Sequence, residues 1–255
     1  MLVSERRARI VEMLRERRTV STEEFAIALE VSTETIRRDL LALDTAGVLD
    51  RVHGGASSPI SARIDDEASF TIRSGSERAA KLRMATAAAK LVRSGQTIVI
   101  DVGTSAAAVA RALPYDLECV VATNSLLVAA ELADRPKIEV LVSGGRLRAG
   151  DLALSNAQTN AFFAEIFADL AFLGSGGVDA AAGLTDFHLD EAAVRRVILG
   201  NAAQSFVLAD ASKFGRIARH HIADLGELSG LITDLAPPAD IECAVTAAHG
   251  VVIVG

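Results

Sequence analysis

The alternation of strand-like and helix-like runs beyond residue 76 constrains this chain most strongly. Such an alternation implies a mostly parallel, doubly wound sheet, because each connecting helix must pack on one of its two faces. The predicted strands are Thr97–Asp101, Cys119–Ala122, Glu139–Val142, Leu170–Leu173, Phe206–Ala209, Gly230–Thr233 and Val251–Val254. The predicted helices are Ser76–Val92, Ser105–Ala112, Ser125–Ala133, Asn156–Phe167, Leu189–Ala203 and Ile241–Ala248.

The composition changes near residue 57, which indicates a domain boundary. The preceding residues are rich in Arg, Glu and Leu, whereas a Pro- and Ser-containing polar stretch follows. A length of 255 residues accommodates one large domain or two unequal ones. We therefore predict a small domain over residues 1–57, a linker over 58–75 and an α/β domain over 76–255.

Several classes of protein are excluded by simple patterns. Cys119 and Cys243 form no CxxC and no other metal-ligand spacing, so neither a zinc site nor a disulfide scaffold is expected. No uncharged run reaches the length of about 18 residues that a membrane span needs. The first residues are not followed by the apolar run of a signal peptide, so none is expected. We expect a cytoplasmic protein with no membrane contact, no metal site and no cofactor.

The first 56 residues are predicted to form three short helices and a hairpin. Ser21 and Glu24 have the spacing of a capping box at the start of the second helix. Ser32 or Thr33 is expected to cap the third helix, and Gly47 to end it. Short strands around a turn are expected between residues 48 and 56.

The third helix of this group is the candidate recognition helix for DNA. If Ile36, Leu40 and Leu43 face the core, helical geometry turns its polar first half outward. Two helices joined by a tight turn, the second carrying adjacent arginines, indicate a helix-turn-helix. Outward-facing arginine can bridge guanine or phosphate, and threonine can contact phosphate or a thymine methyl group. The outward residues are Thr33, Glu34, Thr35, Arg37 and Arg38.

Charge alone argues against nucleic-acid binding. The formal net charge is −7, and residues 1–56 hold 9 Lys and Arg against 10 Asp and Glu. Contact with phosphate would therefore depend on a local patch rather than on the overall charge. An ordinary solvated helix face remains an alternative for Arg37 and Arg38.

The N-terminal motif favours DNA binding through a resemblance. The run Val31-Ser32-Thr33-Glu34-Thr35-Ile36-Arg37-Arg38-Asp39-Leu40, followed by Arg51-Val52-His53-Gly54-Gly55-Ala56, closely resembles the signature of the DeoR family of bacterial transcription regulators. The resemblance implies a winged helix-turn-helix with the third helix in the major groove and the hairpin as its wing. Asp39 is interpreted as a structural residue that orients an arginine. The predicted DNA-binding residues are Ser32, Thr33, Glu34, Thr35, Arg37, Arg38, Arg51 and His53.

Small, hydroxylated and glycine residues follow several predicted strands of the second part. In a doubly wound sheet, ligands bind beyond the carboxyl ends of the strands. Glycine allows backbone N–H groups to approach an anion, and a Gly-Thr-Ser sequence at a helix start is a plausible phosphate cradle. Any single turn of this kind is weak evidence of a site, because such residues are common in strand–helix loops.

The resemblance to the DeoR family extends to this second part through Asp101-Val102-Gly103-Thr104, Thr123-Asn124-Ser125 and Ser212-Lys213-Phe214-Gly215. It implies a sensor domain related to ribose-5-phosphate isomerase, with a phosphorylated sugar or polyol as effector. One departure concerns Gly176, where the family usually has an aspartate. The predicted effector-binding residues are Asp101, Gly103, Thr104, Ser105, Asn124, Ser125, Gly144, Gly145, Arg146, Asp179, Glu191 and Lys213.

Three functions follow from these patterns. The first is a repressor of a carbohydrate-utilisation operon that binds double-stranded operator DNA and is released by the effector. The second is a sugar-phosphate isomerase-like enzyme with an appended helix-turn-helix. The third, a module for protein association only, is disfavoured by the polar face of the third helix. We predict the repressor, with no enzymatic activity, as a homo-oligomer (a dimer or tetramer) that presents two modules to paired half-sites.

Overall fold

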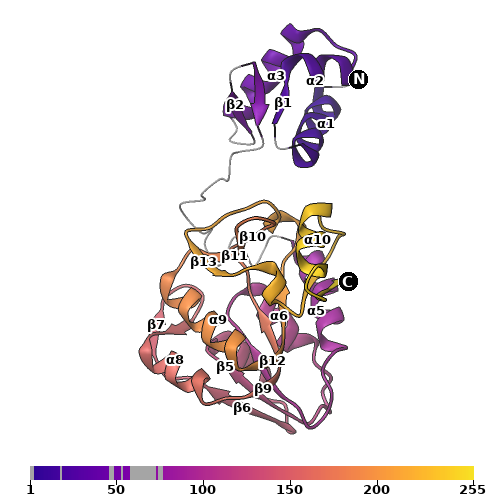
Figure 1. Ribbon diagram of the computed structural model, residues 1–255. Helices are drawn as coiled ribbons and strands as arrows, with labels where there is room; N and C mark the ends of the chain where they lie inside the picture. Colours follow the sequence, from indigo (N-terminus) through magenta and orange to yellow (C-terminus); the bar gives the residue numbers. More distant parts are fainter. Residues whose placement is uncertain (1–2, 18, 46–48, 53, 58–72, 74–76) are drawn as a thin grey trace. The chain divides into compact units, whose positions relative to one another are not determined.

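Figure 1 shows the computed structural model, which describes residues 3–17, 19–45, 49–52, 54–57, 73 and 77–255. The chain divides into two compact units, Met1–Ala62 and Arg63–Gly255. The predicted linker lies outside the described residues except for Arg73, so that interpretation of residues 58–75 stays a prediction.

The N-terminal unit packs three helices against a small antiparallel sheet. Its elements are α1 (Val3–Glu16), β1 (Thr19–Ser21), α2 (Thr22–Ala28), α3 (Thr33–Thr45), β2 (Asp50–Val52) and β3 (Gly55–Ser57). The sheet order is β1-β3-β2. The β2–β3 hairpin confirms the predicted strands, whereas β1 was not predicted. The core consists of buried apolar residues from all three helices, including Ile10, Phe25, Ile36 and Leu40.

The predicted helix starts of this unit are confirmed. Ser21 Oγ accepts a hydrogen bond from the Glu24 amide at 3.1 Å, and Glu24 accepts one from the Ser21 amide at 2.8 Å. Ser32 caps α3, because its Oγ accepts a hydrogen bond from the Thr35 amide at 3.2 Å. Gly47, the predicted helix end, lies outside the described residues.

Asp39 has the structural role that the sequence suggested. Its side chain is buried on α3, and its carboxylate accepts hydrogen bonds from Arg6 Nε at 2.6 Å and Arg7 Nε at 3.0 Å. Burial opposes ionisation, but the two guanidinium groups outweigh it and lower the pKa of Asp39. The motif aspartate therefore ties the first helix to the third.

The larger unit contains the predicted parallel sheet. Its strands, all parallel, lie in the order β15-β14-β12-β9-β4-β5-β6. Their bounds are β4 Thr97–Ile100, β5 Cys119–Thr123, β6 Ile138–Val142, β9 Ala168–Leu173, β12 Ala202–Leu208, β14 Gly230–Thr233 and β15 Val251–Val254. Each of the seven predicted strands is confirmed.

Helices cover both faces of this sheet, as the alternation predicted (Figure 1). On β4, Ile98 and Ile100 pack with the helices of one face, while Val99 packs with those of the other. The first face carries α5 (Arg78–Ala89), α6 (Thr104–Ala112) and α7 (Leu126–Leu132). The second carries α8 (Ala157–Ala164), α9 (Leu189–Asn201) and α10 (Ala239–Thr246).

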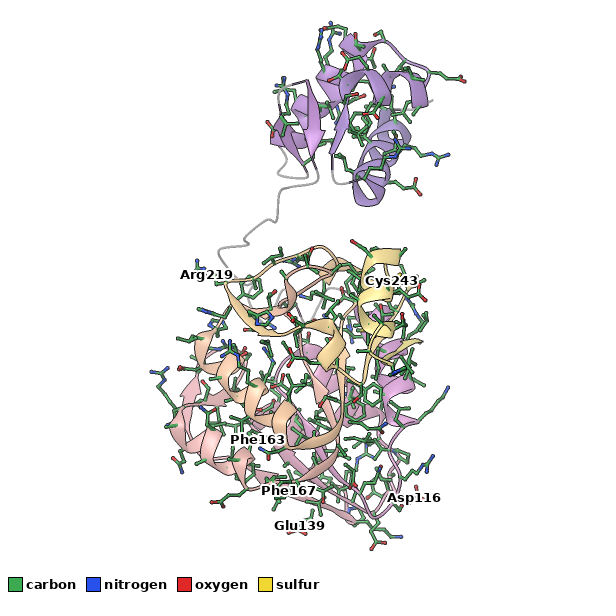
Figure 2. All side chains as sticks on the ribbon, viewed as in Figure 1. Asp116, Glu139, Phe163, Phe167, Arg219 and Cys243 are labelled. Carbon is green, nitrogen blue, oxygen red and sulfur yellow. The ribbon has the colours of Figure 1, made fainter. Side chains whose placement is uncertain are left out.

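Four predicted helices end two or three residues earlier than expected, at Ala89, Ala164, Asn201 and Thr246. The helix predicted to reach Phe167 ends at Ala164, so that Phe163 is buried while Phe167 is 81% exposed (Figure 2). The helix predicted to reach Ala203 ends at Asn201, because Ala202 already pairs with the neighbouring strand β9.

Smaller elements that the sequence did not predict lie around the parallel sheet. They are the hairpin β7 (Arg146–Arg148) and β8 (Ala153–Ser155), the antiparallel sheet of β10 (Gly177–Asp179), β11 (Gly183–Asp186) and β13 (His220–Ala223), and the short 3-10 helices η1 (Ala211–Lys213) and η2 (Leu225–Glu227).

Strand β4 lies between β5 and β9, so the strand order of the parallel sheet reverses there. Ligands of doubly wound sheets bind at such a switch point.

Candidate functional site

The outward half of α3 exposes two arginines that share one carboxylate. The Arg37 and Arg38 side chains are 58% and 80% exposed. Glu34 lies 3.7 Å from Arg37 and 3.6 Å from Arg38, measured between the closest charged atoms. Exposed pairs of this kind contribute little to stability. Both guanidinium groups can therefore exchange Glu34 for a phosphate or a base edge.

The other predicted DNA-binding residues lie close to this helix or on the hairpin. Ser32 and Thr35 are joined through their hydroxyl groups at 2.9 Å, and Thr33 is half-buried at the helix start. Arg51 is exposed on β2, whereas His53 lies outside the described residues. The structure brings the α3 residues onto one helix start, and their contact with DNA stays a prediction.

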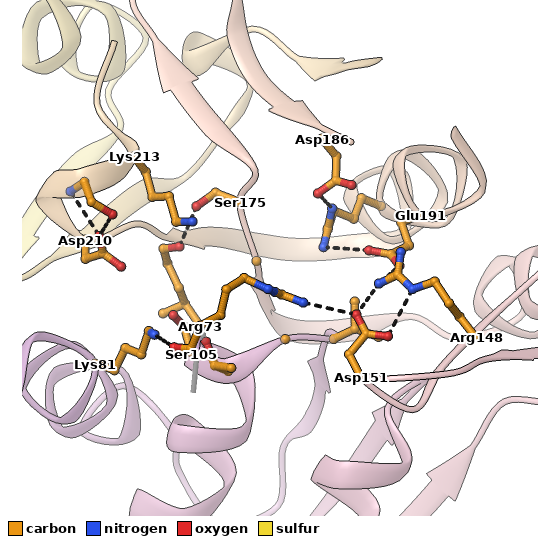
Figure 3. Close-up of a pocket in the computed structure, with 17 residues that line it drawn as sticks. Arg73, Lys81, Ser105, Arg148, Asp151, Ser175, Asp186, Glu191, Asp210 and Lys213 are labelled. Atoms are coloured by element: carbon orange, nitrogen blue, oxygen red, sulfur yellow. Dashed lines mark hydrogen bonds and ion pairs between the residues drawn. The ribbon is translucent and has the colours of Figure 1, made fainter. Parts of the chain in front are cut away.

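The larger unit holds a polar pocket beyond the carboxyl ends of β4, β9 and β12 (Figure 3). Its walls also include the tip of the β7–β8 hairpin, α9, η1 and one residue that precedes α5. The lining residues are Arg73, Lys81, Val102, Gly103, Thr104, Ser105, Arg148, Asp151, Gly174, Ser175, Asp186, Glu191, Arg195, Leu208, Asp210, Ser212 and Lys213.

A fully buried arginine organises one side of the pocket. The Arg195 side chain is 3% exposed, and its Nε lies 2.5 Å from Asp101 Oδ2. Its Nη1 contacts Asp186, and its Nη2 lies 3.6 Å from Glu191 Oε2. Burial alone would lower the pKa of Arg195, but the three carboxylates raise it well above the ordinary value.

A second cluster of ion pairs lies next to the first. Asp151, at the tip of the β7–β8 hairpin, accepts a hydrogen bond from Arg148 Nε at 3.0 Å and one from Arg73 Nη2 at 3.3 Å. Arg148 Nη2 also lies 2.6 Å from Glu191 Oε1, which connects this cluster to the first (Figure 3). The three arginines of the pocket thus already face carboxylates of the protein.

Glu191 is an acid of the pocket whose pKa is raised above its ordinary value. Burial raises its pKa to about 7. The positive charges of Arg195 and Arg148 oppose this rise, whereas the negative charges of Asp186 and Asp101 add to it. The pKa of Asp186 is lowered instead, because Arg195 and the His188 amide outweigh the cost of its burial. Glu191 therefore changes its charge near neutral pH, while Asp186 stays ionised.

The start of α6 faces the pocket with small residues. Gly103 has φ +108°, and a Cβ built there would meet no atom within 4 Å, so the backbone is open on that side. Thr104 and Ser105 form the first turn of the helix and line the pocket. Amide groups of a first helical turn lack acceptors within the helix and favour an anion.

Five of the predicted effector-binding residues line the pocket: Gly103, Thr104, Ser105, Glu191 and Lys213. Asp101 lies beneath it and accepts a hydrogen bond from the Gly174 amide at 2.9 Å. The remaining six residues do not line it: Asn124, Ser125, Gly144, Gly145, Arg146 and Asp179. Effector contact stays a prediction for all twelve.

The six residues outside the pocket mostly support loops. Asn124 Nδ2 donates to the Leu154 carbonyl at 3.1 Å, and Ser125 Oγ accepts from the Val128 amide at 3.2 Å, which caps α7. Asp179 accepts hydrogen bonds from two amides in the β10–β11 turn. Arg146 is exposed and lies 2.7 Å from Asp190. Glycines 144 and 145 approach the side chains of α8.

Sequence reasoning did not select most of the charged lining: Arg73, Lys81, Arg148, Asp151, Asp186, Arg195 and Asp210. Two of these residues carried a usable signal. Lys81 shares the buried face of α5 with Ala85 and Ala88 at helical spacing, an unusual position for a lysine. Arg195 follows Glu191 by one helical turn on a face that includes Ala192.

Among the residues with described structure, no group of three or more His, Cys, Asp or Glu is arranged to hold a metal ion. Cys119 is buried, and Cys243 is exposed (Figure 2). Within that part of the chain, the helices are too short or too polar to span a bilayer.

A winged helix-turn-helix followed by an α/β domain with a polar pocket is the organisation of a ligand-responsive transcription regulator. Residues 6–62 match the family model of the DeoR-like helix-turn-helix domain, and residues 76–235 match that of the DeoR C terminal sensor domain. The chain belongs to the DeoR family of transcriptional regulators.

Full-length relatives agree with this assignment. The chain is 31% identical over 249 residues, 98% of each chain, to the glycerol-3-phosphate regulon repressor of Escherichia coli strain K12. It is 34% identical over 241 residues to the glycerol-3-phosphate regulon repressor of Haemophilus influenzae, covering 93% of this chain and 91% of that one. Among solved structures, ribose 5-phosphate isomerase A from Methanocaldococcus jannaschii matches with a TM-score of 0.39 at 22% identity, over 52% of this chain and 53% of that one.

Proposed function

We propose that this protein is a transcriptional repressor that releases its operator when a phosphorylated sugar or polyol occupies the polar pocket. The observation that carries the proposal is the convergence of five basic side chains on one pocket at the start of α6. They are Arg73, Lys81, Arg148, Arg195 and Lys213. A phosphate group is the natural partner of such a set, because guanidinium and ammonium groups form their strongest hydrogen bonds with anions. The expected dimer or tetramer remains part of this proposal.

The acidic lining of the pocket suits the remainder of such a ligand. Gly176 lacks the aspartate that the family usually has, but Asp186, Glu191 and Asp210 bring carboxylates to the pocket from other segments. A Cβ at position 176 would lie 3.0 Å from the Asp186 Cα, so an aspartate there would displace β11. Hydroxyl groups of a sugar or polyol thus have acceptors despite Gly176. The names of the two relatives support including glycerol 3-phosphate among the compounds tested.

Replacing Lys213 with alanine is expected to reduce the response to the effector. Lys213 lines the pocket from η1, and removing its ammonium group takes away one positive charge that a phosphate would contact. Coupling between two sites is typically about 1–3 kcal/mol, or about 5–150-fold in affinity. Operator affinity of the full chain should fall by such a factor with the effector, and by much less in Lys213→Ala at the same concentration.

The measurement is fluorescence anisotropy on an operator selected in vitro with the full chain. Thermal melting against phosphorylated sugars and polyols identifies the effector, because a ligand of the native state raises the melting temperature. Lys137→Ala is the matched control, since Lys137 is exposed and precedes β6 at the opposite edge of the sheet. An unaltered response in Lys213→Ala, or release by unphosphorylated sugars, would contradict the proposed site.

An isomerase-like activity is the second candidate function, and the pKa of Glu191 near 7 is the observation that favours it. We propose that this carboxylate is not a catalytic base, because Arg148 lies 2.6 Å from one of its oxygens and Arg195 lies 3.6 Å from the other. Both contacts hold the group in place. Incubation with ribose 5-phosphate or hexose phosphates should therefore return only starting material by NMR. Isomer formed in proportion to protein, and abolished in Glu191→Gln, would establish the enzyme instead.

A further inference from the structure

Arg73 reaches the polar pocket from the segment that precedes the sensor helices. In sequence it directly follows residues 58–72, which lie outside the described residues and contain the division between the two units after Ala62. Its Nη2 lies 3.3 Å from Asp151 Oδ2, and the two side chains are 16% and 5% exposed. Residues 73 and 151 are 78 positions apart. Arg73 is therefore held by the same hairpin tip that lines the pocket.

The main chain of Arg73 is held as well. Lys81 Nζ donates a hydrogen bond to the Arg73 carbonyl oxygen, and Lys81 itself is buried on α5 (Figure 3). Burial lowers the pKa of Lys81, and the charge of Arg73 lowers it further against the opposing charges of Asp210 and Glu77. Both the side chain and the backbone of residue 73 thus depend on charged groups that line the pocket.

The pocket is too full to accept a sugar phosphate without rearrangement. Its free volume is about 50 Å³, whereas sites for small molecules usually offer about 300–1,000 Å³. Five basic and four acidic side chains line it, and Asp101 adds a fifth carboxylate against Arg195. An incoming anion must therefore replace carboxylates that already face the arginines.

Asp151 is the carboxylate best placed to be replaced. It lies in the turn between β7 and β8, near Gly150, which has φ +101°, and Leu152, which has φ +54°. Its pKa is lowered because the hydrogen bond from Arg148 and the charges of Arg148 and Arg73 outweigh its burial. It thus presents an anion to two arginines, as a ligand phosphate would.

We propose that Asp151 occupies the place of the effector's anionic group against Arg73 and Arg148, and that the effector displaces it. Arg73 then changes partner when the pocket fills, and this change of partner is coupled to DNA binding by the N-terminal unit. This inference rests on the proposed function and names the residue that couples the pocket to DNA. Arg73 is a positioning residue of the response as well as a ligand contact.

The first test compares the ratio of operator dissociation constants with and without saturating effector. This ratio should be about 5–150 for the parent chain and less than about 2 for Arg73→Gln, with saturation verified by thermal melting. Arg83→Gln is the matched control, because Arg83 Nη2 forms a similar pair with Asp234 Oδ2 at 3.1 Å outside the pocket lining. It should keep the parent's ratio. A parental ratio in Arg73→Gln would overturn the proposal.

The second test needs no operator and uses inorganic phosphate as the probe. Asp151→Asn should bind phosphate at least about tenfold more tightly than the parent chain by calorimetry, because it removes the competing anion. Asp210→Asn, which removes another carboxylate from the same pocket, should gain less than about threefold. Equal gains in phosphate affinity in the two variants would reveal a general effect of charge. They would overturn the proposal that the anion takes the place of Asp151.

The two tests separate this inference from the proposed function. In one outcome, no phosphorylated compound weakens operator binding by the parent chain, while Asp151→Asn still binds phosphate more tightly. The repressor mechanism then fails, but the replacement of Asp151 by an anion stands. If the parent chain releases DNA and Arg73→Gln releases it equally, the repressor mechanism stands and the role of Arg73 fails. If Asp151→Asn does not fold, the Arg73→Gln ratio decides alone.

Discussion

Replacing Arg195 with glutamine should lower the free energy of unfolding of the sensor unit by about 3–5 kcal/mol. Arg195 is 3% exposed and faces Asp101, Asp186 and Glu191, whose side chains are also almost fully buried. Removing one partner of a buried ion pair leaves uncompensated charge in a poorly solvated interior, which costs about this amount. Glutamine keeps a similar length but supplies no charge for the three carboxylates.

Urea denaturation of the full chain, followed by circular dichroism, measures the effect. Arg146→Gln is the control, because it breaks an arginine–aspartate pair whose side chains are 74% and 46% exposed. It should cost less than about 1 kcal/mol. Similar losses in the two variants would show that the buried cluster is not the source of stability.

The pH dependence of the Arg195→Gln deficit gives a second check. The folded-state pKa of Glu191 is already raised to about 7, and losing Arg195 removes a group that opposes this rise. Because the folded-state pKa of Glu191 exceeds the unfolded value of 4.5, protonation of Glu191 favours the folded state. This contribution to stability is fully present below pH 4.5 and is lost as the pH rises through 7. The deficit should therefore be larger at pH 8 than at pH 5.5.

The parallel sheet was predictable because its residues obey a simple physical rule. Strands covered on both faces consist almost entirely of apolar residues, as in Thr97–Ile100 and Gly230–Thr233, and helices separate them at regular intervals. The capping box at Ser21 was equally predictable, since its hydrogen bonds depend only on residues three positions apart. Local rules predict local structure.

Several strands of three or four residues, unlike those of the predicted β2–β3 hairpin, were not predictable for the opposite reason. A strand such as β1 or β7 is too short to show an alternation of polar and apolar residues. Its existence depends on a partner supplied by the fold, as in the pairing of Val20 with Ala56. The whole antiparallel sheet β10-β11-β13 was missed for this reason, although it contributes Asp186 to the pocket.

The polar pocket was predicted only where it follows the sheet directly. The start of α6 and Lys213 were found because loops at the carboxyl ends of parallel strands meet at one edge. The arginines were not selected, because a sequence gives no sign of carboxylates that lie far along the chain; the one-turn spacing of Glu191 and Arg195 was a local signal among the arginine pairs of this pocket. Arg195 and Asp101 are 94 residues apart, and Arg73 and Asp151 are 78 apart. Only the fold joins them.

Replacing Arg37 or Arg38 with alanine should weaken operator binding by about 1–3 kcal/mol, or about 5–150-fold. Both side chains are largely exposed near the start of α3, and their nearest carboxylate, Glu34, lies more than 3.5 Å away. An arginine that reads a base should relax specificity at one position of the operator. One that contacts phosphate should weaken all sequences alike and reduce the salt dependence of binding by about one charge.

Titration of operator and random duplexes at several salt concentrations separates these two roles. Arg9→Ala is the matched control, because Arg9 is 64% exposed on α1 and forms a comparable pair with Glu12 at 3.3 Å. It should bind operator within about twofold of the parent chain. The net charge of −7 makes this result informative, since the overall field repels DNA and any affinity must come from a local surface. Unchanged binding in both Arg37→Ala and Arg38→Ala would place that surface elsewhere than on α3.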